Sequence, residues 1–216
     1  RAVGALELKT PQNIFTNLTG LKVSKFSFPG LKRRDKRGNF VMLITACNGI
    51  EYILSFRSSL KLASVEEIAL RNLSKESAPV PKLINRTGSW LLQEYISGPR
   101  LSEVLGRGKL DQSYDILETA ISSLLQIQDL ARKIGLGKHM KPICNSHAWR
   151  NERTGWLTSL ADVSNSSLPK LNEEQINSVL TVKPTSFVKW DARPGNAILT
   201  KNAKVIWFDW EHCGCR

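Results

Sequence analysis

Short apolar runs separated by turn-forming residues dominate the first part of the chain. Apolar and β-branched residues in such runs, bounded by glycines, are typical of strands. The runs that we expect to form strands are residues 21–28, 40–46 and 51–57. Together they predict an antiparallel meander of about three strands, whereas residues 1–20 are mixed and give only weak signals.

Helical signals begin after this meander. Ser64 followed by Glu67 has the spacing of a capping box, which predicts a helix from Ser64 to about Lys75. An extended connection begins near Pro79, and residues 90–97 read as a strand. Apolar residues at spacings of three and four predict a long helix at residues 110–134. Residues 155–163 and 172–182 are further helical candidates. Gly135 suits the end of the long helix, and residues 164–170 read as a polar linker.

The C-terminal segment has a different pattern. Two short apolar runs, residues 197–199 and 205–208, flank a polar turn, which predicts a β-hairpin. Asp191 and Asn196 lie just before this hairpin, and Asp209 follows its second strand.

This order of polar residues has a chemical interpretation. An acid, an amide five residues later, a hairpin and a second acid form the layout of a kinase catalytic loop followed by its metal-binding aspartate. Asp191 is the candidate acceptor of a proton from a substrate hydroxyl. Asn196 and Asp209 supply the hard oxygen ligands that magnesium prefers. Arg193 lies in the turn between the acid and the amide and is a candidate for contacting phosphate or bracing the loop.

At these residues the chain resembles the aminoglycoside phosphotransferase-like, or choline kinase-like, small-molecule kinases. Their usual loop is H-G-D-x-x-x-x-N, followed by a hairpin and D-x-E or D-W-E. Here residues 189–196 read K-W-D-A-R-P-G-N, and residues 209–211 read D-W-E. The departure is Lys189, which stands where the family usually has a histidine that supports the loop.

The resemblance implies an α+β, two-lobed protein-kinase-like fold. Residues 1–97 would form a small β-rich N-lobe that covers the nucleotide, and residues 98–216 a mostly helical C-lobe with the catalytic loop and the metal-binding hairpin. Because the family normally adds several helices after the D-W-E motif, the C-lobe is expected to be truncated. The implied function is ATP- and Mg²⁺-dependent phosphorylation of a hydroxyl on a small molecule, such as an aminoglycoside, choline or a sugar.

The resemblance also assigns a phosphate-binding lysine to the third strand, where this chain has Ser55. Side chains at positions i and i+2 share one face of a strand, so Arg57 is expected to reach the same phosphates. The fold places the glutamate partner of this cation on the following helix. The capping box gives Glu67 a structural role, which makes Glu66 the better candidate.

The strand at residues 90–97 leads into a hinge in this family. The backbone of Glu94, Tyr95 and Ile96 is expected to bind the adenine there. Backbone recognition leaves little side-chain signature, so these three residues are placed by position alone. The family resemblance also implies a short helix after the hinge, at residues 101–105.

Charge and composition leave two alternatives open. The chain has 31 basic and 19 acidic residues, a formal net charge of +12, and a dense basic run at residues 32–37. This balance favours a basic nucleic-acid or anionic-surface binder, although no nucleic-acid-binding motif accompanies the run and a solvated loop is the favoured interpretation. The second alternative is a pseudokinase or regulatory nucleotide-binding module, suggested by Ser55 and Lys189.

The four cysteines are scattered along the 216 residues and do not form a disulfide framework, which favours a reducing cytoplasm. The short stretch from His212 to Cys215 lacks a second ligand pair at zinc-like spacing. No run of eighteen apolar residues exists, so no membrane span is expected.

Overall fold

The computed structural model describes residues 2–29, 38–106, 110–140 and 186–215. The helices expected at residues 155–163 and 172–182, the linker between them and the basic run at residues 32–37 lie outside this part. Along the described chain, no helix is both long enough and apolar enough to cross a bilayer.

A five-stranded antiparallel sheet forms the first half of the chain, with strand order β1-β2-β3-β5-β4. Its strands are β1 (Val23–Ser27), β2 (Phe40–Ala46), β3 (Glu51–Phe56), β4 (Leu83–Thr87) and β5 (Trp90–Glu94). The predicted meander of three strands is confirmed by β1, β2 and β3, which pair in sequence order. The expected strand at residues 90–97 ends earlier, at Glu94, and β4 was expected only as an extended connection.

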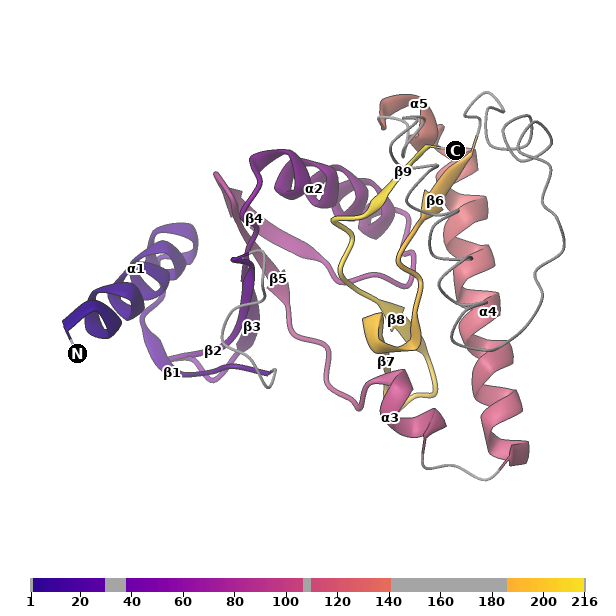
Figure 1. Cartoon of the computed structure of the whole chain (residues 1–216), viewed down its shortest axis with the longest axis horizontal. Helices are drawn as coiled ribbons and strands as arrows, with labels where there is room; N and C mark the ends of the chain where they lie inside the picture. The colour runs from indigo at the N-terminus through magenta and orange to yellow at the C-terminus, as the bar shows by residue number, and fades with distance from the viewer. Residues whose placement is uncertain (1, 30–37, 107–109, 141–185, 216) are drawn as a thin grey trace, which may run out of the picture.

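One face of the sheet is closed by the N-terminal helix α1 (Ala2–Thr19) (Figure 1). Met42, Leu54 and Leu92 are adjacent across β2, β3 and β5 and are almost fully buried. Phe15 of α1 is fully buried in the same cluster, with its ring centroid 5.4 Å from that of Tyr52. The weak sequence signals at residues 1–20 missed this helix, because packing on the sheet stabilises it more than its own composition does.

Helix α2 (Leu60–Lys75) follows β3 and begins one turn earlier than the sequence predicted. Its N-cap is Ser59, whose side chain makes no capping hydrogen bond, so the capping box assigned to Ser64 and Glu67 is wrong. Tertiary contacts explain why the helix begins earlier than the local sequence indicates. Ala63 is fully buried, and Glu67 pairs with Arg71 and Arg86 rather than with the helix start.

The C-terminal half contains four helices and two small sheets among the described residues. The helices are α3 (Leu101–Leu105), α4 (Leu110–Lys133), α5 (Leu136–His139) and the 3₁₀ turn η1 (Pro194–Asn196). The strands are β6 (Phe187–Lys189) with β9 (Cys213–Cys215), and β7 (Ala197–Leu199) with β8 (Val205–Trp207). The expected β-hairpin is confirmed by β7 and β8. Gly135, with a φ of 65°, follows the end of α4 as expected.

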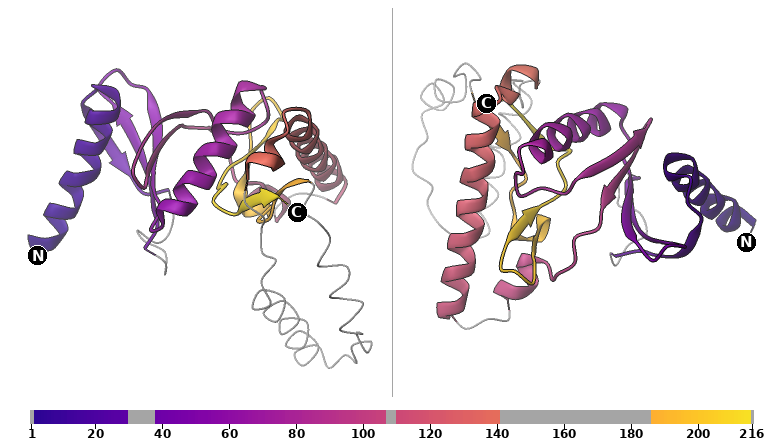
Figure 2. Two further views of the ribbon diagram at one scale, coloured as in Figure 1. Left: turned by 90° about the horizontal axis from the view of Figure 1, so that it is seen from above. Right: turned by 180° about the vertical axis from the view of Figure 1, so that it is seen from behind.

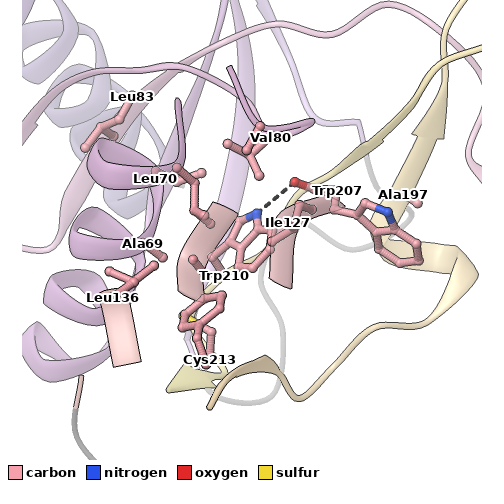
Figure 3. Close-up of a cluster of buried hydrophobic side chains, with 14 of the residues drawn as sticks. Ala69, Leu70, Val80, Leu83, Ile127, Leu136, Ala197, Trp207, Trp210 and Cys213 are labelled. Atoms are coloured by element: carbon pink, nitrogen blue, oxygen red, sulfur yellow. Dashed lines mark hydrogen bonds between the residues drawn. The ribbon is translucent and has the colours of Figure 1, made fainter. Parts of the chain in front are cut away.

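The largest hydrophobic cluster joins the two halves of the chain (Figure 3). Leu70 of α2 and Ile127 of α4 lie in it together with Trp207 and Trp210, all almost fully buried. The Trp210 indole Nε1 donates to the carbonyl of Trp207 at 2.7 Å. Helix α2 therefore packs on the C-terminal strands as well as on its own sheet, and the boundary expected at residue 97 stays a prediction.

Seen from several sides, α1 lies at one end of the molecule and α4 at the other, with the large sheet, α2 and the β7–β8 hairpin between them (Figure 2). The chain crosses from β5 to α3 along the edge of this hairpin. Leu199 N donates to Pro99 O at 3.0 Å. The crossing therefore links the end of the large sheet directly to the segment that contains the predicted site.

Gly98 makes this close approach possible. Its φ is +151°, and a Cβ added there would lie 2.2 Å from the carbonyl oxygen of Leu199. A contact of that length with backbone forces the two segments apart.

We predict that Gly98→Ala destabilises the fold by more than the roughly 1–3 kcal/mol of an unfavourable backbone conformation alone, because a backbone clash is added. Gly49→Ala is the matched control, since Gly49 also has positive φ (+81°) but no atom within 4 Å of the added Cβ. Denaturant unfolding of both variants measures the difference. Equal destabilisation would show that the approach of Gly98 to β7 does not limit this position.

Candidate active site

The loop between β6 and β7 holds Asp191 and Asn196 against each other. Arg193 N donates to Asp191 O at 3.0 Å and Asn196 N donates to Arg193 O at 2.8 Å, which closes the turn. The side-chain nitrogen of Asn196 donates to Asp191 Oδ2 at 2.8 Å and to Asp191 O at 3.1 Å. Because the amide nitrogen faces Asp191, the amide oxygen has no partner among the described residues and remains available as a ligand.

Asp209 follows β8 in a left-handed backbone conformation, with a φ of +61°. Two contacts hold the backbone on either side of it. Phe208 N donates to Asn196 O at 3.0 Å, and the Lys189 ammonium donates to Asp209 O at 2.5 Å. This places the candidate metal ligands Asn196 and Asp209 at the base of one hairpin, as the sequence spacing predicted.

Arg57 connects the large sheet, α2 and the C-terminal strands. It follows β3, and its side chain is only 7% exposed. Its Nε lies 2.6 Å from Glu66 Oε2, its Nη2 2.9 Å from Asp209 Oδ1 and its Nη1 3.3 Å from Glu211 Oε2. One guanidinium therefore contacts three carboxylates from two distant segments of the chain.

The electrostatics of this group depend on the balance between burial and attraction. Burial alone lowers the pKa of Arg57, but the attraction of Glu66, Asp209 and Glu211 and the hydrogen bond to Glu66 outweigh burial and raise its pKa above the ordinary value. Arg57 is therefore charged at every accessible pH. Three carboxylate side chains thus share one guanidinium, and the Lys189 ammonium also lies close to Asp209.

Glu66 is fully buried on α2 and also accepts a hydrogen bond from Gln93 Nε2 at 3.1 Å. The expected ion pair between Arg57 and Glu66 is present. Glu67 instead binds Arg71 and Arg86. Partial burial raises the pKa of Glu67, but hydrogen bonds from Arg86 and Arg71 outweigh this and lower it. Glu67 thus stabilises the outer side of α2 and lies outside the group around Arg57.

Lys189 contacts the backbone and an aromatic ring next to the loop that contains Asp191 and Asn196. Besides its contact with Asp209 O, its ammonium lies 4.8 Å from the centroid of the Trp210 ring. Burial lowers the pKa of Lys189, and the nearby charges of Asp209 and Asp191 partly oppose this. Lys189 therefore makes a specific contact with the backbone of the candidate metal ligand Asp209.

A cavity of about 460 Å³ lies between the large sheet and the C-terminal hairpin. Ser55, Arg57 and Gln93 line it from the sheet, and Asn196, Phe208 and Asp209 from the hairpin side. Asp191 adjoins it through Asn196, with its side chain 29% exposed. Arg193 also lines the cavity, is 66% exposed and lies 3.3 Å from Asp191 Oδ1. The volume is within the usual range for ligand pockets.

The predicted hinge residues Glu94, Tyr95 and Ile96 also line this cavity. The Glu94 carboxylate accepts a hydrogen bond from Lys82 N at 2.8 Å, so the side chain of Glu94 is bound to the residue that precedes β4. The backbone of Ile96 makes no hydrogen bond to the described residues. A donor and an acceptor on the backbone at this edge fit the recognition of a planar heterocycle.

Side-chain oxygens and a guanidinium of the site suit a magnesium–nucleotide complex, because magnesium is usually bound by one or two carboxylates together with substrate phosphates. Asn196 Oδ1 and Asp209 Oδ2 have no partner among the described residues and suit this role. The Arg57 guanidinium has five N–H donors, and its three contacts leave two for phosphate oxygens.

Two residues of this group were missed by sequence reasoning. Glu211 belongs to the D-W-E motif, whose spacing places two acids close together, and this signal was present but given no role. Asn39 precedes β2 and carries no local signal. Its side-chain nitrogen donates to Glu211 Oε2 at 3.3 Å, and its oxygen accepts from Ser58 N at 2.8 Å. Asn39 therefore joins the start of β2 to the end of β3 and to Glu211.

No protein-family model matches the sequence, and no curated protein matches it. Solved structures do resemble it. A spectinomycin phosphotransferase in complex with ADP and spectinomycin matches with a TM-score of 0.59 at 10% identity, over 96% of this chain and 69% of that one. A macrolide 2'-phosphotransferase from Brachybacterium faecium matches with a TM-score of 0.55 at 16% identity, over 94% and 71%.

A choline kinase from Streptococcus pneumoniae matches with a TM-score of 0.54 at 17% identity, over 97% of this chain and 70% of that one. Identities this low establish the fold alone. The chain has the protein-kinase-like fold of these small-molecule phosphotransferases, so the resemblance seen in the sequence is confirmed for the fold.

The contacts of Arg57 generate a stability prediction. Arg57→Met leaves Glu66, Asp209 and Glu211 without their shared cation, and breaking a buried ion pair from one side typically costs about 3–5 kcal/mol. We expect a loss of that order in the free energy of unfolding, measured by guanidinium chloride denaturation.

Arg132→Met is the control for this experiment. Arg132 pairs with Asp129 on α4, and their side chains are 78% and 69% exposed. An exposed pair of this kind contributes at most about 1 kcal/mol. If the two variants lose equal stability, the buried contacts of Arg57 do not hold the site together.

Proposed function

We propose that the chain is an ATP-dependent phosphotransferase that phosphorylates a hydroxyl of a small molecule, in the cytoplasm. The observation that carries the proposal is the convergence of Asn196, Asp209 and Arg57 at one cavity, with Asp191 hydrogen-bonded to Asn196 beside it. The expected catalytic loop supplies the first and last of these residues, the hairpin the second and the large sheet the third. The fold shared with known phosphotransferases supports this assignment.

Each residue has a defined role in this proposal. Asp191 orients the acceptor hydroxyl and takes its proton as the hydroxyl oxygen bonds to the γ-phosphorus and ADP leaves. Asn196 and Asp209 hold magnesium, which would neutralise charge on the phosphates. Arg57 presents its remaining N–H donors to phosphate oxygens, and Glu66 fixes its position. Catalysis by such a site rests mainly on positioning and charge stabilisation.

The remaining predicted residues complete the site. The backbone at Glu94, Tyr95 and Ile96 binds the base, and Arg193 braces Asp191 or contacts phosphate from the open side. The named neighbours include phosphotransferases for spectinomycin and macrolides and a choline kinase. Aminoglycosides, amino alcohols and sugars are therefore the acceptors to test first.

The metal ligands generate one prediction. Calorimetry of ATP binding with and without Mg²⁺ should show much tighter binding with the metal, and Asp209→Ala should remove this difference, because the carboxylate that holds the metal is lost. Thermal unfolding of the variant without ligand checks that it is folded. Equal ATP affinity of the wild-type protein with and without Mg²⁺ would contradict the assignment of Asn196 and Asp209.

The proposed base generates the second prediction. Asp191→Asn should leave nucleotide affinity nearly intact and lower turnover about 10²–10⁴-fold, the usual contribution of a general base. The assay measures ADP formation across a panel of aminoglycosides, amino alcohols and sugars.

Asp129→Asn, which removes an exposed carboxylate of α4, is the control and should leave turnover unchanged. The catalytic role of Asp191 would be wrong if the wild-type protein bound Mg-ATP but phosphorylated none of these acceptors, and Asp191→Asn behaved in the same way. That result would favour the pseudokinase alternative instead.

A further inference from the structure

Ser55 is a buried polar residue that the proposed mechanism does not use. It lies on β3 and is 2% exposed, and its hydroxyl is the one buried side-chain polar atom without a hydrogen-bond partner among the described residues. The residue lines the 460 Å³ cavity. An unpaired buried hydroxyl is unfavourable, because it has lost its bonds to water and gained none in return.

The side chains next to Ser55 in the sheet offer its hydroxyl no hydrogen-bond partner. Ser55 pairs across the sheet with Val41 of β2 and Leu91 of β5, both apolar. An alanine would fit the same space without the unfavourable burial. A buried hydroxyl beside a cavity that has no partner among the described residues is typical of a group whose partner is a ligand.

The position of Ser55 indicates which part of a ligand it meets. Ile53 and Ser55 of β3 and Arg57 directly after it lie at alternate positions, and all three line the cavity. Ile53 lies toward the hinge, and Arg57 reaches Asp209. Ser55 lies between them, about 7 Å along the strand from each, since residues at i and i+2 are two strand rises apart.

We propose that the Ser55 hydroxyl donates a hydrogen bond to an oxygen of the bound nucleotide's first phosphate, the one attached to the ribose. This inference rests on the proposed nucleotide binding. A nucleotide with its base at the hinge and its terminal phosphate at Arg57 and Asp209 brings the first phosphate to the middle of β3. Rotation about χ1 turns the hydroxyl from its buried position toward the cavity without moving the strand.

This role differs from that of a lysine at the same position. A serine is smaller than a lysine and leaves space beside it. The contact with Glu66 is made instead by the guanidinium of Arg57, which lies two residues after Ser55. The cation and the donor to the first phosphate are then two separate residues, and each can be removed alone.

The test uses Ser55→Ala and calorimetric titrations with adenosine, AMP, ADP and ATP in the presence of Mg²⁺. We expect the variant to bind AMP, ADP and ATP about tenfold or more weakly, because a hydrogen bond to a charged group is lost. Adenosine, which has no phosphate, should bind both proteins equally. The unliganded variant should melt about 2–4 °C higher, since an unpaired buried hydroxyl has been removed.

Ser58→Ala is the matched control, because Ser58 is exposed near the same strand and does not line the cavity. Its affinities and melting temperature should equal those of the wild-type protein. An equal loss for adenosine would place the contact on the ribose and overturn the phosphate assignment. Unchanged affinities with a higher melting temperature would show a tolerated packing defect and also overturn it.

A lower melting temperature of unliganded Ser55→Ala, with unchanged affinities, would show that the hydroxyl has a structural partner such as water, which overturns the inference as well. The proposed function fails separately. If the wild-type protein binds none of the three nucleotides, both proposals are wrong. If the wild-type protein binds them and Ser55→Ala binds them with the same affinity, only the role of Ser55 is wrong.

Discussion

The arrangement of the site depends on the guanidinium of Arg57. It contacts Glu66 of α2 and, from the segment between β8 and β9, Asp209 and Glu211. Desolvating these charges is costly, and a buried ion pair often adds little net stability. The consequence of this ion-pair group is geometric. Because the three carboxylates share one cation, β3, α2 and the hairpin are held at defined distances from one another. The cavity between the sheet and the hairpin follows from that spacing.

The remaining contacts support the same geometry from other directions. Lys189 fixes the carbonyl of Asp209, Asn39 holds Glu211, and Gly98 lets the crossing segment lie directly against β7. Behind them, Trp207 and Trp210 pack with α2 and α4 in the largest hydrophobic cluster (Figure 3). The polar groups that line the cavity are therefore backed by a layer of buried apolar side chains.

Much of this could be predicted from the sequence, for reasons that differ between elements. The β7–β8 hairpin and the spacing of Asp191, Asn196 and Asp209 are local, so the order of residues was enough. The pairing of Arg57 with a glutamate of α2 followed from the family resemblance together with strand alternation. The capping box that favoured Glu66 over Glu67 is absent, so the choice of Glu66 was right for a wrong reason. Helix α1 could not be predicted, because its stability comes from the sheet on which Phe15 packs.

Tertiary contacts also explain the errors. Ser64 and Glu67 have the spacing of a capping box, but Arg86 on β4 binds Glu67, and the helix starts at Leu60. Glu211 and Asn39 meet across 172 positions of the chain, a distance over which no local pattern operates. Residue type and spacing therefore indicated the chemistry, whereas the partners of each charge required the three-dimensional structure.

The central claim is that metal and nucleotide bind this site together, with Asn196 and Asp209 supplying only part of the oxygen ligands that magnesium takes. Titration of Mn²⁺ followed by electron paramagnetic resonance tests it most directly, since free and bound Mn²⁺ give distinct signals. The account predicts weak Mn²⁺ binding to the protein alone and a ternary complex when ATP is added, with the protein and ATP each required. Tight Mn²⁺ binding without ATP, or ATP binding that leaves the signal of Mn²⁺–ATP unchanged, would contradict it.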